Sequence, residues 1–267
     1  MKSLLIVTLW VTMAQPWANL ANTSFSKEIN TQQASTIQVS ATWGDVMLRL
    51  TDDPVVKVTG NAMINGQPYD DRIQINEKKK GDKIVIEIEL EFDDIEKVVY
   101  LRDKEGNYTY TKSKGFDHSQ GWKGFDSMNY GHHIEANYVI EVPRDKILKA
   151  YTTYGDIESK ELPAKSHVVA TYGDVEMSID DFSSQADYYI ESTYGHVDIA
   201  VPEDLNASLG LSTSYGSIYT DLNMNYKNSA KQGENCGRGE DIKTVMGNGM
   251  AKLDIEATYD NIYLRAL

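Results

Sequence analysis

The chain has 267 residues, and its 40 acidic and 26 basic side chains give a formal net charge of −14 at pH 7. This acidity argues against binding to nucleic acid or anionic lipid, because both require basic patches on the protein. The sequence contains a single cysteine, Cys236, which excludes an intramolecular disulfide and a cysteine-rich metal site.

The N-terminus has the layout of a secretory signal peptide. Lys2 gives a positive start, a mostly apolar run follows over residues 4–13, and small residues come after it. The run is shorter than the roughly 20 residues that a membrane-spanning helix needs, and no later segment is apolar enough to cross a membrane. We therefore expect residues 1–21 to be a signal peptide, cleaved after Ala14 or Ala21. Residues 22–267 would then form one domain exported to the periplasm, the cell surface or the extracellular space.

One short phrase recurs along the chain. It first reads Ala-Thr-Trp-Gly-Asp-Val over residues 41–46, and later becomes Thr-Tyr-Gly-Asp or a close variant. A repeat of about 20 residues is typical of architectures in which each unit buries its apolar face against its neighbours. The tyrosines of the phrase are Tyr154, Tyr172, Tyr194, Tyr215 and Tyr259.

Within a unit, apolar and polar residues alternate with a period of two, which is typical of a half-buried strand. The same alternation is predicted for residues 193–201, with Thr193 on the inner face, and for residues 258–266, with Thr258 on the inner face. No segment shows a helical stripe, so the chain is expected to be all-β. In residues 169–179 the predicted inner face carries Val169, Thr171, Gly173, Val175, Met177 and Ile179.

Two folds use such strands, an antiparallel sandwich and a parallel solenoid. Turns of the Asn-Gly type are sparse, and the two that occur, at residues 65–66 and 248–249, lie outside the closely spaced repeats. The repeated phrase keeps one register, as units stacked directly over one another require. We therefore expect a parallel β-solenoid whose units stack in sequence order, each with two or three short strands.

A glycine in each phrase is expected to mark a corner where the backbone bends or where no Cβ fits. Asp260 replaces this glycine in the last unit. Because aspartate tolerates the left-handed conformation, the replacement suits a less constrained turn at the end of the stack. The corner glycines are Gly44, Gly155, Gly173, Gly195 and Gly216.

Two stretches break the pattern. Residues 92–133 are rich in glycine, serine, lysine and aromatic residues, and they are predicted to form one long loop insertion, a kind of segment that is usually functional or mobile. Its histidines, His118, His132 and His133, lack the spacing of metal ligands and are predicted to be exposed. Residues 224–249 form a second irregular stretch in the place of a missing repeat.

The run of residues 138–157, a strand ending in Val-Pro followed by one ending in Gly-Asp-Ile, resembles the signature of a known family. Residues 201–218 repeat that signature, and residues 246–262 resemble the family's closing glycine-rich turn and final strand. Over residues 36–267, apart from the insertion, the chain is similar to the bacterial putative-adhesin family of exported β-strand-repeat proteins, formerly a domain of unknown function. The resemblance implies a right-handed parallel β-helix in an exported protein, and it brings no catalytic residues.

Stacking would place the five tyrosines in one column on the outer face, with Asp156, Asp174 and His196 beside them. Successive units lie about 4.8 Å apart, so the column would offer flat amphipathic faces to a sugar or a peptide chain. These tyrosines and their three neighbours are the predicted ligand-binding surface. Two alternatives stay open: the rings can serve only to stabilise the sheet, and the carboxylates, with Glu158 and Glu176, could hold Ca²⁺.

The sequence has no Gly-x-Ser-x-Gly motif, phosphate loop or dinucleotide fingerprint, so neither an enzymatic activity nor a cofactor or metal is predicted. The expected function is that of an exported, non-enzymatic adhesin or surface-presenting protein, with a glycan or an envelope protein as partner. Two alternatives stay open. One is a polysaccharide-acting enzyme, since carboxylates about 5 Å apart suit a retaining glycosidase, and the other is a structural or signalling module of the envelope. The oligomeric state is left open, although exposed terminal strands would allow end-to-end association.

Overall fold

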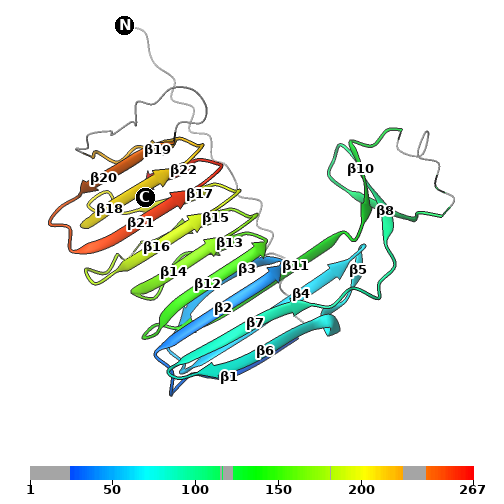
Figure 1. The fold of residues 1–267 in the computed structure, drawn as a ribbon, viewed down its shortest axis with the longest axis horizontal. Coiled ribbons are helices and arrows are strands. Elements are labelled where there is room, and N and C mark those ends of the chain that lie inside the picture. Colours follow the sequence, from blue (N-terminus) through cyan, green and yellow to red (C-terminus); the bar gives the residue numbers. More distant parts are fainter. Residues whose placement is uncertain (1–24, 115, 117–122, 181, 225–238) are drawn as a thin grey trace, which may run out of the picture.

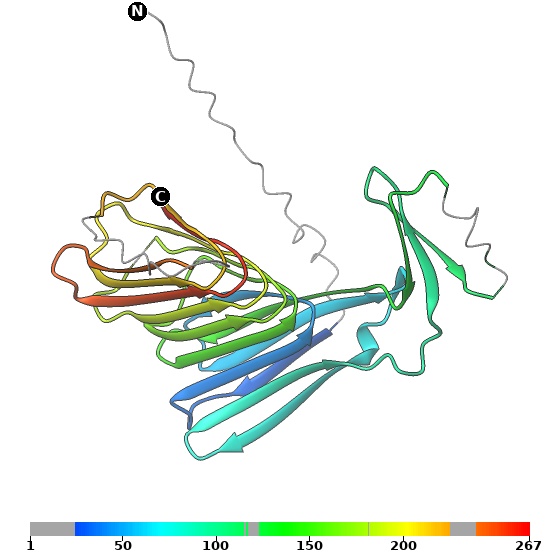
Figure 2. The same cartoon turned by 45° about the horizontal axis from the view of Figure 1, so that its top comes forward.

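The computed structural model describes residues 25–114, 116, 123–180, 182–224 and 239–267. Over these residues the chain is β-structure, as predicted, apart from turns and one short 3-10 helix, η2 (Asp70–Arg72). Two large sheets face each other, and a small third sheet projects from one end (Figures 1 and 2). In this part of the chain no helix has the length and apolar character needed to span a membrane. The predicted signal peptide, Cys236 and His118 lie outside the described residues.

The first large sheet has ten strands in the order β1-β4-β11-β3-β13-β15-β17-β22-β19, with β5 paired to β4. It carries the second strand of each repeat unit. Its strands are β1 (Phe25–Asn30), β3 (Asp45–Thr51), β4 (Val55–Ile64), β5 (Gln67–Pro68), β11 (Ile134–Pro143), β13 (Ile157–Ser159), β15 (Val175–Ser178), β17 (Val197–Val201), β19 (Ile218–Thr220) and β22 (Ile262–Ala266).

The second large sheet has nine strands in the order β20-β18-β21-β16-β14-β12-β2-β7-β6. It carries the first strand of each repeat unit. Its strands are β2 (Thr36–Trp43), β6 (Ile73–Lys80), β7 (Lys83–Leu90), β12 (Ile147–Tyr154), β14 (Lys165–Ala170), β16 (Asp187–Ser192), β18 (Ala207–Thr213), β20 (Asp241–Val245) and β21 (Ala251–Ala257).

Each repeat unit runs along a strand of the second sheet, turns through the repeated phrase, and continues along a strand of the first sheet. Neighbouring units pair in parallel, in a register that places Ile157 beside Val175 and Val175 beside Val197. The inward side chains of both sheets form one continuous core in which Val168 and Ile190, from the second sheet, are fully buried. The period of two predicted these strands because each buries only one face.

The prediction that every second residue faces the core without a shift at the corner was wrong. Val169 is half-buried, whereas Ala170 is fully buried, and the inner face resumes at Gly173. The corner turns the chain from one sheet to the other, so the strands before and after it bury opposite parities. The other residues predicted inside but found half-buried are Thr171, Thr193, Thr258 and, next to the chain end, Ala266.

The last unit of the sequence is not the last in the stack. Strand β21 pairs in parallel with both β16 and β18, and β22 pairs in parallel with both β17 and β19. The unit of β21 and β22 therefore lies between its two predecessors, and the predicted stacking in sequence order was wrong here. Tyr215 takes the outermost place instead of Tyr259. Strand β20, from the second stretch predicted to be irregular, pairs antiparallel with the free edge of β18.

The opposite end of the stack is closed by antiparallel strands (Figure 1). Strand β11 pairs in parallel with β3 but antiparallel with β4, β1 follows β4 in antiparallel pairing, and β6 and β7 form a hairpin. Purely parallel pairing therefore holds for neighbouring repeat units and not for the whole of both sheets. The edge strand β6 ends in Lys78, Lys79 and Lys80, which are exposed, and such charges discourage pairing with another chain.

Residues 92–133 are not one irregular loop, contrary to the prediction. They contain three antiparallel strands, β8 (Val98–Arg102), β9 (Tyr108–Lys112) and β10 (Ser127–Gly131), which form the third sheet in the order β10-β8-β9. Residues of these strands are rich in valine, threonine and tyrosine, which favour strands. We call residues 92–133 the arm, because its sheet projects from the end of the stack (Figure 2).

Candidate ligand-binding surface

Six aromatic rings stand one above another along the corner of the stack. Neighbouring ring centroids lie 4.4–5.0 Å apart, and neighbouring planes are within 16° of parallel. This spacing follows from the distance of about 4.8 Å between neighbouring strands, since the units are in register. We call these rings the aromatic ladder, which runs in spatial order through Trp43, Tyr154, Tyr172, Tyr194, Tyr259 and Tyr215.

The structure thus brings together all five tyrosines of the predicted surface and adds Trp43 to them. Trp43 stacks on Tyr154 with a centroid distance of 4.4 Å. Its place in the ladder could have been inferred from the sequence, because it stands in the repeated phrase where the later units have tyrosine.

The corner glycines allow the units to approach one another closely. A Cβ added to Gly155 would collide with the backbone of Gly44, and a Cβ added to Gly173 would collide with the backbone of Gly155. Among the five corner glycines only Gly44 has a positive φ, of 103°. Close backbone approach, rather than a left-handed conformation, therefore requires glycine at the other corners.

The aromatic ladder exposes the edges of its rings rather than their faces. Between 43% and 59% of each tyrosine in the ladder is exposed, yet each inner ring has a neighbour stacked on both faces. Within the part of the chain that the structure describes, none of the five tyrosine hydroxyls forms a hydrogen bond. The surface therefore offers a row of ring edges and hydroxyls, in place of the flat faces expected from the sequence.

Beside the aromatic ladder, side chains bond to the backbone of the neighbouring unit. A carboxylate oxygen of Asp45 accepts the backbone N–H of Asp156 at 2.9 Å, and Asp156 in turn accepts the backbone N–H of Asp174 at 2.7 Å. The predicted site residues Asp156 and Asp174 thus help to hold the units together. We call this column the polar ladder, which runs in spatial order through Asp45, Asp156, Asp174, His196, Asn261 and Ser217.

His196 changes the pattern of the polar ladder. It cannot supply a carboxylate oxygen to the next unit, and the backbone N–H of Asn261 is accepted instead by Asp260, at 2.7 Å. Asp260 was expected to form a left-handed turn at the end of the stack, but its unit is internal and its φ is not positive. Its carboxylate replaces the acceptor that His196 lacks, and the pattern then resumes as Asn261 accepts the backbone N–H of Ser217 at 2.9 Å.

His196 lies between two carboxylates. Its Nδ1 is 2.9 Å from Oδ1 of Asp174, and its Nε2 is 3.7 Å from Oε1 of Glu176. Hydrogen bonds to Asp174 and Glu176 raise the pKa of His196 to about 10, so the imidazole is charged at neutral pH. Burial opposes ionisation of Asp174, but its hydrogen bonds with His196 hold its pKa below the ordinary value. The middle of the polar ladder is therefore an ion pair.

The remaining carboxylates of this face do not form a metal site. Burial raises the pKa of Asp45 and of Asp156, although the N–H that each accepts works in the opposite direction. Glu158 lies beside Glu176 in register, and the next residue of that column, Asp198, accepts a hydrogen bond from Arg265. Among the described residues no group of three or more histidine, cysteine, aspartate or glutamate side chains is placed to hold a metal ion.

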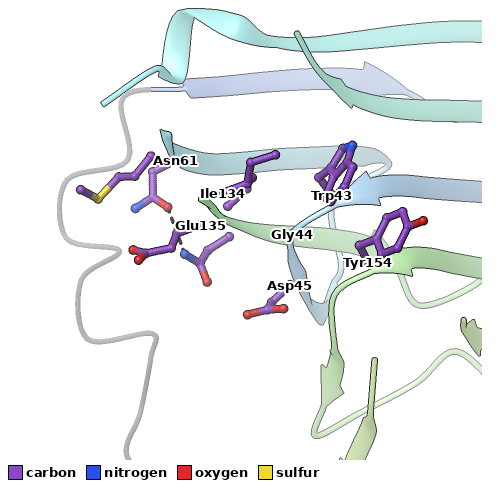
Figure 3. A pocket seen from close by; sticks show the side chains of 10 residues that line it. Trp43, Gly44, Asp45, Asn61, Ile134, Glu135 and Tyr154 are labelled. Carbon is purple, nitrogen blue, oxygen red and sulfur yellow. Dashed lines mark hydrogen bonds between the residues drawn. The ribbon is translucent and has the colours of Figure 1, made fainter. Parts of the chain in front are cut away.

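A pocket of about 420 Å³ lies where the aromatic ladder begins (Figure 3). Trp43 and Tyr154 line it at the corner, and Asp45 lines it from β3. The sequence analysis identified only Tyr154 of this set as a site residue. Trp43 and Asp45 belong to the repeated phrase, but the remaining residues come together only through the pairing of β11 with β3 and β4. The further residues of the lining include Asn61, Met63, Ile134, Glu135 and Asn137.

The described histidines of the arm are half-buried, not exposed as predicted. His133 lies 3.9 Å from the ring centroid of Tyr108, and its Nδ1 is 2.8 Å from the hydroxyl of Tyr110. Burial lowers the pKa of His133 and raises that of Tyr110 to about 12. Nε2 of His132 is 2.8 Å from the backbone oxygen of Ile95. Both histidines thus hold parts of the arm together, and His133 also joins the arm to the stack, because its backbone N–H and carbonyl bond to Asn65.

This fold is shared with known proteins. Residues 140–265 match the family model described as Toastrack DUF4097. A crystal structure described as that of a putative cell adhesion protein from Clostridium sporogenes is similar with a TM-score of 0.53 and 13% identity, over 91% of this chain and 98% of that chain. No curated protein matches this chain. The match of residues 140–265 to the Toastrack model, together with this structural likeness, confirms the resemblance to the putative-adhesin family that the sequence indicated.

Proposed function

We propose that this chain is an exported, non-enzymatic β-solenoid that presents the aromatic ladder as an adhesive surface of the cell envelope. The observation that carries this proposal is the row of half-exposed tyrosines whose hydroxyls have no partner within the described residues. Contiguous exposed apolar patches are uncommon on soluble proteins and mark interaction sites. Tyrosine combines an apolar ring with a polar hydroxyl, which suits it to such contacts.

The geometry of the ladder favours repeated weak contacts over one strong contact. Neighbouring tyrosine rings are 4.7–5.0 Å apart, so equivalent hydroxyls recur along the corner at about the strand spacing. A partner that places polar groups at intervals along its own length, such as a glycan or an envelope protein, would meet several hydroxyls at once. Simultaneous contacts of this kind raise the overall affinity far above that of each contact. The fold shared with the protein from Clostridium sporogenes that is described as a putative cell adhesion protein supports the same role.

The test separates the hydroxyls from the stacked rings. A variant with Tyr154, Tyr172 and Tyr194 changed to Phe keeps the stacking and loses three hydroxyls. Tyr219→Phe is the matched control, because Tyr219 is 52% exposed and stacked on Tyr263 but lies outside the ladder. We expect the triple variant to unfold at the wild-type temperature and to bind cell surfaces and a glycan array at least 10-fold more weakly. The control should bind as the wild type does.

Equal binding by the triple Phe variant would contradict the proposal, and the ladder would then serve only to stabilise the stack. The alternative role, as a structural or signalling module of the envelope, is tested with the same proteins. A pull-down from envelope extract that returns one protein, together with no binding to any glycan, would favour that role. Cleavage of a polysaccharide by the folded chain would instead favour the enzymatic alternative.

A further inference from the structure

The pocket at the start of the aromatic ladder exists because the repeat ends there. Strand β11 pairs with β3 but enters the sheet from the arm, without passing through a corner of the repeated phrase. Beside Trp43, where the next unit would stack a ring, Phe92 instead lies edge-on with its ring centroid 5.6 Å away, and Ile134 and Glu135 of β11 line the pocket that remains (Figure 3). A volume of about 420 Å³ lies within the range of small-ligand pockets, about 300–1,000 Å³.

Three neighbouring strands place a row of polar side chains in this pocket. Asn137 of β11 lies in register with Asp45 of β3 on one side and with Asn61 of β4 on the other. The strands are held close, since a Cβ added to Gly44 would lie 2.7 Å from Cβ of Ala136. The row therefore has a fixed backbone geometry, and it extends the polar ladder beyond the last ring of the aromatic ladder.

The polar groups of this row retain capacity for a ligand. Asp45 uses one carboxylate oxygen to accept the backbone N–H of Asp156, and within the described residues its other oxygen has no partner. The amide nitrogen of Asn137 is 3.4 Å from Oδ1 of Asn61, a long hydrogen bond, so the oxygen of Asn137 and the nitrogen of Asn61 are left without partners there. Glu135 is exposed and has one contact, at 3.5 Å, with His133.

The combination of groups selects among ligand classes. No lysine or arginine lines the pocket, and two carboxylates do, which disfavours an anionic ligand. A cation would use the carboxylates and the oxygen of Asn137 but would leave the amide N–H groups of Asn61 unused, because these only donate. Neighbouring hydroxyls both donate and accept, so they match carboxylates and amides together. Trp43, Ile134 and Met63 add apolar surface for the C–H groups of a ring.

We infer that this pocket binds a neutral sugar unit of a glycan chain, with Asp45, Asn137 and Asn61 recognising its hydroxyls and Trp43 contacting its ring. The inference rests on the proposed adhesive function and gives it a ligand class and a defined site. A glycan seated here would continue along the aromatic ladder, because Tyr154 belongs both to the pocket and to the ladder.

The test begins with an array of neutral, sialylated, sulfated and amino oligosaccharides, followed by titration of the neutral oligosaccharide that binds best. The pocket variants are Asn137→Ala and Asp45→Asn, the second of which keeps an oxygen for the N–H of Asp156. The matched control is Asp260→Asn, which makes the same change at a carboxylate that also accepts a backbone N–H but lies outside the pocket and outside the predicted ligand-binding surface. Thermal unfolding checks that each variant is folded.

A second readout reports on the pocket directly. The chain has four tryptophans, and the full chain with Trp10, Trp17 and Trp122 changed to Phe keeps only Trp43. Titration of this variant with the same oligosaccharide should change the fluorescence of Trp43. The dissociation constant obtained from this change should equal the one measured for the wild type. We expect Asn137→Ala and Asp45→Asn to weaken binding at least 10-fold, and Asp260→Asn to weaken it less than 2-fold.

Several results would overturn the inference, and they differ from those that overturn the adhesive function. Binding only to sialylated, sulfated or amino glycans would contradict the ligand class. Binding of a neutral glycan that is lost with the three Tyr→Phe changes but unaffected in the folded pocket variants would contradict the site and leave the ladder's function intact. A folded chain that binds cells but no glycan on the array would overturn this inference alone, and no binding to either would overturn both.

Discussion

The carboxylate oxygen Oδ1 of Asp174 contacts His196 twice, accepting its backbone N–H at 2.7 Å and lying 2.9 Å from Nδ1 of its imidazole. The first contact repeats the bond that the neighbouring units of the polar ladder make. The second exists only here, because the next residue in the column carries a positive charge in place of another carboxylate.

This pair predicts a stability that depends on pH. The pKa of His196 is about 10 in the folded chain against an ordinary value of 6.5, so protonation favours the folded state. The contribution is complete below pH 6.5, declines as the pH rises from 6.5 to 10, and is absent above pH 10. Solvent screens this half-exposed pair, and we expect it to contribute about 1–2 kcal/mol. Urea unfolding of wild type and His196→Gln should show that difference at pH 6 and its loss by pH 10.5. A difference that is independent of pH would contradict the assignment.

The compensation between His196 and Asp260 predicts a coupling between two substitutions. Asp260→Gly alone leaves the backbone N–H of Asn261 without its acceptor and should lower the free energy of unfolding by about 1 kcal/mol. When His196→Asp is added, the new carboxylate can accept that N–H as the aspartates of the other units do. The double variant should therefore be more stable than the sum of the two single changes predicts, by about 1 kcal/mol in a double-mutant cycle. Additive effects would show that Asp260 does not act as the replacement acceptor.

The corner glycines are predicted to tolerate no larger residue, because the backbone of the neighbouring unit occupies the place of a Cβ. Gly173→Ala places a Cβ against the backbone oxygen of Gly155, which cannot rotate away as a side chain can. The two units must separate locally, and we expect a loss of about 1–3 kcal/mol in the free energy of unfolding. Thr171→Ala, in the same corner but half-buried and without a side-chain hydrogen bond to a described residue, is the control and should change stability by less than about 0.5 kcal/mol. Similar losses for both variants would argue against close approach as the reason for glycine.

The aromatic ladder predicts that an internal ring contributes more to stability than the end ring. Tyr194 stacks on two neighbours, whereas Tyr215 stacks only on Tyr259. Their exposed fractions are similar, 49% and 59%. Tyr194→Ala should therefore cost about 0.5–1.5 kcal/mol more than Tyr215→Ala, which is the contribution of one aromatic pair. Calorimetry or denaturant unfolding of both variants measures the difference, and equal costs would show that stacking adds little.

The sequence could predict the features that repeat. The phrase around Tyr154, Tyr172 and Tyr194 recurs in one register, and because parallel strands stack equivalent residues, the column of rings and the column of carboxylates followed from it. Trp43 belonged to the same pattern and was available from it. Features that depend on the turn of the chain at the corner could not be predicted. The corner shifts by one residue which side chains are buried, so Val169 was predicted to be buried although Ala170 is the buried residue.

Features that depend on long-range pairing were also beyond the sequence. Asn61, Asn137 and Asp45 stand in ordinary strands, and only the antiparallel pairing of β11 with β4 brings the two asparagines together. In the same way, nothing in the phrase around Tyr259 distinguishes a unit at the end of the stack from one inserted within it. The choice is made by the strand edges that β16 and β18 leave open, which is a property of the assembled sheet.

The insertion of the last unit has a consequence for the order in which the chain can fold. Repeat units as far as β17 can join the stack in the order in which they are synthesised. The unit of β18 and β19 has no neighbour on its inner side until residues 251–266 arrive, because β21 and β22 fill that place. The pairing is therefore non-local, and loop closure must precede it. Completion of the fold depends on this segment, so the stack cannot be finished before residues 251–266 are available.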